Sequence, residues 1–91
     1  MQVFTRNDLK NMYINLNNQI MNISSSIIKE VLVKAKYYPE NNQYQKSKWD
    51  NLRLNNYMMD EICKILRLTF TDLSIYFISI DTNPTLIVDW S

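Results

Sequence analysis

Hydrophobic residues at helical spacing dominate the first part of the chain. They recur every three or four positions, at Leu9, Met12, Tyr13, Leu16, Ile20 and Ile23. This is the period of one face of an α-helix. Thr5 can cap the start of such a helix, and Asp8 follows three positions later, near the positive end of the helix dipole. The pattern therefore predicts a helix over residues 6–23 or 6–25.

The next segment, residues 27–38, has two interpretations. Three serines at positions 24–26 can break the helix, and the following β-branched residues alternate with others as they do in a strand. However, Ile27, Val31 and Ala35 also continue the helical stripe. We favour a strand over residues 27–38, with a continuation of the helix as the alternative. Pro39 ends the element in either case.

The middle of the chain changes from polar to helical. Residues 40–51 are polar and without a period, which predicts a surface loop, and residues 51–54 can add a short strand. Asn55 or Asn56 then caps a second helix that closes at residues 70–72. Its buried stripe is formed by Met58, Ile62, Ile65 and Leu66.

The end of the chain predicts a β-hairpin. Residues 73–80 and 85–90 alternate as strands, and residues 81–84 (DTNP) form a turn between them. The resulting order is α-β-(β)-α-β-β. We expect a single α+β domain over residues 1–91, with two helices packed on one face of a small, mostly antiparallel sheet.

The composition indicates a folded protein without a strongly charged surface. Of its 91 residues, 46% are hydrophobic and 12% are aromatic, and the net charge is +1. No segment has the pattern of a signal peptide or the length of a membrane-spanning helix. Cys63 is the only cysteine and cannot form an intramolecular disulfide. These features predict an intracellular protein, in a host cytoplasm or a virion if the source is viral.

Catalytic chemistry has little support in the sequence. There is no histidine and no glycine, so most metal sites, neutral acid–base catalysis and glycine-rich phosphate loops are excluded. Cys63 borders the stripe of the second helix, which favours a buried structural thiol over a reactive one. Asp60 and Glu61 are adjacent and point in different directions on a helix, so they do not converge on a metal ion. We expect no enzyme activity, no catalytic residue, no cofactor and no metal.

Basic and aromatic residues gather between positions 29 and 53, a stretch with six basic and three acidic side chains. The candidate contact residues are Lys34, Lys36, Lys46, Lys48, Tyr37, Tyr38, Tyr44 and Trp49. Aromatic rings beside cations can stack on bases and neutralise the phosphates of a single strand. The alternative is a solvated loop whose aromatic side chains pack onto the core.

Aromatic and methionine side chains are also abundant for such a small core. They include Tyr57, Met58, Met59, Trp49 and Trp90. Such side chains are typical of protein interfaces, although a core position is the favoured interpretation for Met58 and Trp90. The last strand, which ends at Trp90, could also offer an open edge to another chain.

Three short stretches carry a resemblance. They are residues 4–9 (FTRNDL), residues 56–63 (NYMMDEIC) and residues 86–91 (LIVDWS). In these stretches and in its order of elements, the chain resembles small α/β proteins encoded by AT-rich large DNA viruses. The many asparagine, isoleucine and lysine residues, all with AT-rich codons, agree with such a genome. The resemblance implies a viral protein, in some cases a virion component, and identifies no functional residue.

We favour a non-enzymatic protein–protein interaction or structural protein, including a component of a viral or phage particle. Its contact residues would be Tyr37, Tyr38 and Trp49, and its partner would be another protein or a second copy of the chain. One alternative is a small nucleic-acid-binding module that uses residues 34–53. The other is an inhibitor of a host factor that presents its acidic C-terminal half. Insertion into a membrane is not expected.

Overall fold

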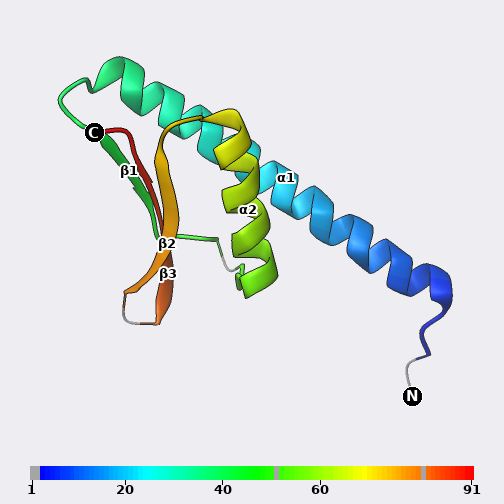
Figure 1. The fold of residues 1–91 in the computed structure, drawn as a ribbon. Helices are drawn as coiled ribbons and strands as arrows, with labels where there is room; N and C mark the ends of the chain where they lie inside the picture. Colours follow the sequence, from blue (N-terminus) through cyan, green and yellow to red (C-terminus); the bar gives the residue numbers. More distant parts are fainter. Residues whose placement is uncertain (1–2, 51, 81) are drawn as a thin grey trace.

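The chain forms two helices and three strands in the order α-β-α-β-β (Figure 1). The computed structural model describes residues 3–50, 52–80 and 82–91. The elements are α1 (Arg6–Tyr37), β1 (Gln43–Lys46), α2 (Asn56–Thr69), β2 (Ser74–Ile80) and β3 (Asn83–Asp89). The predicted α+β fold class is confirmed.

Helix α1 runs without a break through the three serines, so the strand predicted over residues 27–38 is wrong. Its start is as predicted, with Thr5 and Asp8 bonded to each other's backbone N–H in a capping box. Ser24, Ile27 and Val31 lie on one buried stripe of the same helix. Packing of this stripe against the core outweighs the strand preference of the β-branched residues, because tertiary contacts supply most of a helix's stability.

Strand β1 lies inside the segment predicted to be a loop, and this prediction is also wrong. Its four residues pair antiparallel with β3, from Gln43 opposite Asp89 to Lys46 opposite Leu86. The strand is too short and too polar to show a period, and it exists because β3 offers a hydrogen-bonding edge. Residues 52–54 have no regular structure, which contradicts the short strand considered for residues 51–54. The first position of that strand, Asn51, lies outside the described residues.

The sheet has the order β1-β3-β2, and both pairs are antiparallel. Strand β3 is therefore the central strand, and the expected open edge at the end of the chain is wrong. The hairpin turn is tighter than predicted, because Asn83 pairs with Ile80 and Pro84 with Ser79. Of the predicted turn, Asp81 lies outside the described residues, and Thr82 adopts a left-handed backbone conformation with φ of 63°.

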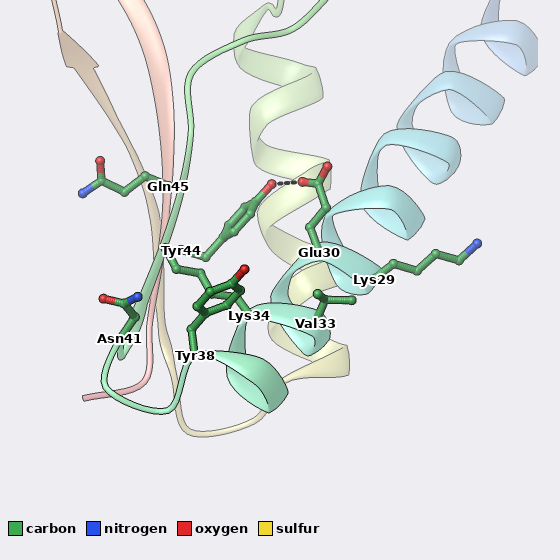
Figure 2. Close-up of a pocket in the computed structure, with 8 residues that line it drawn as sticks. All are labelled: Lys29, Glu30, Val33, Lys34, Tyr38, Asn41, Tyr44 and Gln45. Carbon is green, nitrogen blue, oxygen red and sulfur yellow. Dashed lines mark hydrogen bonds between the residues drawn. The ribbon is translucent and has the colours of Figure 1, made fainter.

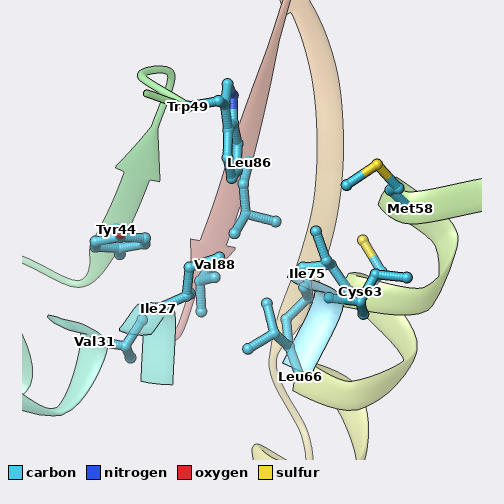
Figure 3. Close-up of a cluster of buried hydrophobic side chains, with 12 residues drawn as sticks. Ile27, Val31, Tyr44, Trp49, Met58, Cys63, Leu66, Ile75, Leu86 and Val88 are labelled. Carbon is cyan, nitrogen blue, oxygen red and sulfur yellow. The ribbon is translucent and has the colours of Figure 1, made fainter. Parts of the chain in front are cut away.

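Both helices cover the same face of the sheet, and the core lies between these two layers (Figure 3). Helix α2 begins at the predicted cap, where Met58 N–H donates to the Asn55 side chain. Met58, Ile62 and Leu66 are buried as predicted, and Trp90 packs partly buried against them. The other buried side chains of this cluster are Ile20, Ile27, Val31, Tyr44, Trp49, Cys63, Ile75, Leu86 and Val88.

Candidate interaction site

A groove of about 520 Å³ lies between the C-terminal half of α1 and strand β1 (Figure 2). Its lining is mainly apolar at the base, with charged and amide groups around it. The residues from α1 and its end are Lys29, Glu30, Val33, Lys34 and Tyr38, and those from β1 and the turn before it are Asn41, Tyr44 and Gln45. The groove exists because α1 continues past the serines and the chain then returns as an edge strand.

Tyr44 forms the floor of this groove. Its side chain is 8% exposed, and its hydroxyl donates a hydrogen bond to the Glu30 carboxylate on α1 (Figure 2). Burial raises the pKa of Tyr44, and the bond to Glu30 raises this pKa further. The Glu30 carboxylate keeps its negative charge, but the two lysines of the lining outnumber it, so the groove carries a net positive charge.

The rim of the groove combines apolar surface with positive charge. Val33 is 51% exposed and Tyr38 is 53% exposed. Lys34 is half-buried at the same place, and Lys29, four residues before Val33, is exposed. An apolar ligand side chain can cover Val33 and Tyr38, while an acidic one can approach Lys34.

The free edge of β1 adds unpaired backbone groups to the groove. The Trp90 N–H donates to the Asn42 carbonyl, at 2.9 Å. Backbone groups that face a neighbouring strand recur at every second residue. The N–H and C=O of Gln43 and Gln45 therefore point away from β3, to the side where the described residues supply no further strand. Along this edge β1 can accept another strand.

A titration tests the environment of Tyr44. A raised pKa means that the unfolded chain loses the phenol proton first as the pH rises above the ordinary tyrosine value of about 10. We expect the free energy of unfolding to fall above pH 10, by up to about 1.4 kcal/mol per pH unit for this one group. In Tyr44→Phe this slope should be reduced, and Tyr37→Phe, at an exposed position, is the control. Urea unfolding at pH 8–11 measures this slope. Equal slopes in Tyr44→Phe and the wild type would contradict a raised pKa of Tyr44.

The eight candidate residues from the sequence fall into different places. Lys34 and Tyr38 line the groove together with Tyr44, whose ring is buried. Trp49 is 7% exposed and its Nε1–H donates to the Pro84 carbonyl at 2.8 Å. Tyr44 and Trp49 therefore follow the alternative considered for this stretch, in which aromatic side chains pack onto the core.

The remaining candidates lie away from the groove. Tyr37 is 63% exposed at the end of α1, with the Lys36 ammonium 5.3 Å from its ring centroid. The Lys46 ammonium lies 5.4 Å from the ring centroid of Trp49. Lys48 is exposed after β1. The structure therefore does not bring the four lysines and four aromatic rings onto one surface.

Five groove residues were missed by sequence reasoning: Lys29, Glu30, Val33, Asn41 and Gln45. The first three lie within residues 27–38, which were predicted to be a strand and belong to helix α1. A helical wheel of α1 extended to residue 37 would have put Val33 and Lys34 on the same side as Glu30, because residues three to four apart are neighbours on a helix. Nothing in the sequence marked Asn41 and Gln45, which are brought in by strand pairing.

Chemistry elsewhere in the chain is limited. Cys63 is 6% exposed, as predicted for a structural thiol, and burial raises the pKa of this thiol. A raised pKa keeps the thiol protonated and weakly nucleophilic. Among the described residues, no three acidic or cysteine side chains are grouped as a metal site would need. Within the same residues, neither helix is long and apolar enough to cross a bilayer.

The chain matches no family model, and no curated protein or solved structure is significantly similar to it. The resemblance to proteins of large DNA viruses therefore stays a prediction.

Proposed function

We propose that this protein is an interaction module that binds an extended segment of another protein in the groove between α1 and β1. The open edge of β1 beside this groove carries the proposal. An extended segment placed there gains main-chain hydrogen bonds from Gln43 and Gln45, and its alternate side chains enter the groove. Strand addition beside a helix is an established mode of peptide recognition.

The lining selects the chemistry of the bound segment. Val33 and Tyr38 favour an apolar side chain, since both expose about half of their surface. Lys34 and Lys29 favour an acidic side chain, because these two ammonium groups outnumber the single Glu30 carboxylate in the lining. The preferred partner is therefore an extended segment that combines β-branched and acidic residues. This proposal keeps the expected class of protein–protein interaction and the contact residue Tyr38, but replaces Tyr37 and Trp49 with groove residues.

A binding measurement with two peptides tests this preference. The probe is a capped eight-residue peptide of alternating threonine and valine with two adjacent central glutamates, and its control carries two lysines instead. Neighbouring residues in a strand point to opposite faces, so one of the two charges enters the groove in either register. We expect the glutamate peptide to bind about tenfold more tightly, because each charge contact at such a surface is worth up to about 1 kcal/mol.

Matched variants locate the binding. Lys34→Glu should abolish the preference for the glutamate peptide, whereas Lys36→Glu, outside the groove lining, should retain it. Gln45→Pro removes one outward N–H donor and should prevent binding, while Gln45→Ala removes only the side chain and should bind normally. Equal affinities for both peptides, or equal binding by the two Gln45 variants, would reject the proposal. Binding of single-stranded RNA in place of either peptide would favour the nucleic-acid alternative.

A further inference from the structure

The N-terminal end of α1 is largely uncovered by the rest of the described chain, apart from a hydrogen bond between Tyr13 and Tyr57 of α2. It extends beyond α2 and the sheet, and it is the blue part of the ribbon in Figure 1. Every residue from position 3 to position 15 is exposed. Six large apolar side chains in this stretch are 50–75% exposed: Val3, Phe4, Leu9, Met12, Tyr13 and Ile14. A helical segment shorter than about 12–15 residues is only marginally stable in water unless other residues cover its apolar face.

The exposed face continues the stripe that is buried farther along the same helix. Apolar residues alternate at spacings of four and three: Leu9, Tyr13, Leu16, Ile20, Ile23 and Ile27. Ile20 and Ile27 are buried in the core, whereas Leu9 and Tyr13 are both 58% exposed. A regular seven-residue repeat of this kind is the pattern by which helices pack along one another.

Charge is absent from the middle of this helix. Between Lys10 and Lys29, an 18-residue stretch contains no acidic or basic residue. Depletion of charge is a mark of the core of a protein interface. The stretch contains asparagine, glutamine and serine, and no helix of the described chain meets the criteria for crossing a membrane.

The exposed area has the size of a dimer interface. The accessible surface is 6919 Å², whereas a compact monomer of this mass exposes about 5,600 Å². The excess of about 1,300 Å² exceeds the roughly 800 Å² that each partner buries in a standard interface. The radius of gyration is 15.4 Å, compared with about 12 Å for a compact domain of this length.

Charges next to the exposed face are complementary under a two-fold axis. Arg6 and Lys10 border Leu9 and Tyr13 on this face. Tyr13 is hydrogen-bonded to Tyr57 at the start of α2, and the Glu61 carboxylate interacts electrostatically with both tyrosines. If two copies of α1 pair antiparallel about Tyr13, Lys10 of each copy lies beside Glu61 of the other. The helix dipoles also oppose each other in this arrangement.

We propose that the N-terminal half of α1 packs antiparallel against the same segment of a second copy of this chain, forming a two-fold dimer. The interface is centred on Leu9 and Tyr13, and Lys10 pairs with Glu61 of the other copy. A two-fold interface uses the same surface on both chains. Each groove between α1 and β1 stays open, because it lies at the other end of α1.

Sedimentation equilibrium of the full chain at about 1–100 µM tests this dimer. We expect twice the monomer mass of 10.9 kDa at the upper concentrations. Leu9→Gln should weaken the dimer at least about tenfold, because both copies lose the contact. Leu68→Gln is the control, since Leu68 is 76% exposed on α2, away from the proposed interface. The core should stay folded in both variants, with the cooperative urea unfolding of the wild type, because neither residue is buried.

A charge exchange identifies the partner as this same chain. Lys10→Glu and Glu61→Lys should each weaken the dimer, and the double variant should restore it. A monomer at all concentrations would overturn the proposal. Equal dimer dissociation constants for Leu9→Gln and Leu68→Gln would overturn it as well. Binding of monomers to phosphatidylserine vesicles, lost in Leu9→Gln, would assign this face to a lipid surface instead. None of these variants changes the groove, so the dimer and the peptide-binding function can fail separately.

Discussion

Replacing Trp49 with alanine is expected to lower the free energy of unfolding by about 3–5 kcal/mol, the usual cost of removing a buried aromatic side chain. Trp49 is 7% exposed, and its ring centroid lies 5.8 Å from that of Phe77 on β2. Its Nε1–H also donates to the Pro84 carbonyl on β3. The residue therefore connects the segment after β1 to the two other strands, and its removal leaves both a cavity and an unpaired carbonyl.

Urea unfolding followed by circular dichroism measures this loss. Trp49→Phe keeps part of the packing and removes the hydrogen bond, so it should fall between the wild type and Trp49→Ala. Tyr37→Ala is the matched control, because that ring is 63% exposed and surface substitutions change stability by about 0.5 kcal/mol or less. Trp49→Ala with the stability of Tyr37→Ala would mean that Trp49 is a surface contact residue, as the sequence suggested.

Replacing Ser25 with proline is expected to cost about 3 kcal/mol or more. Ser25 is exposed in the middle of α1, so no packing is lost. In a continuous helix its N–H donates to the carbonyl four residues earlier, and proline both removes this donor and clashes with that carbonyl. If the helix ended at the serines, as the sequence favoured, proline at this position would be tolerated.

The control for this prediction is Ser25→Ala, which keeps the backbone donor and has a higher helix propensity. It should be as stable as the wild type or slightly more stable. Both variants can be compared by urea unfolding with detection at 222 nm, where loss of α1 lowers the native signal as well. Equal stability of Ser25→Pro and Ser25→Ala would show that α1 is not continuous at this point.

The candidate site was only partly predictable because its two walls come from segments that the sequence assigned wrongly. Lys34, Tyr38 and Tyr44 were named as contact residues and do line the groove. They were named for being basic or aromatic, and that criterion equally selected Trp49, which is in the core. Burial of an aromatic ring depends on which strand passes beneath it, and this is a long-range property.

The sequence by itself determined the elements whose signals are local. The cap at Thr5, the cap at Asn55 and the stripe of α2 depend on residues three or four positions apart, so they can be recognised without knowledge of the fold. The tertiary structure alone decided the course of residues 24–37 and the existence of β1. Both propensities were present in that segment, and burial of Ile27 and Val31 in the common core selected the helix. Strand β1 required an edge of β3, whose paired residues lie 40 to 46 positions later in the chain.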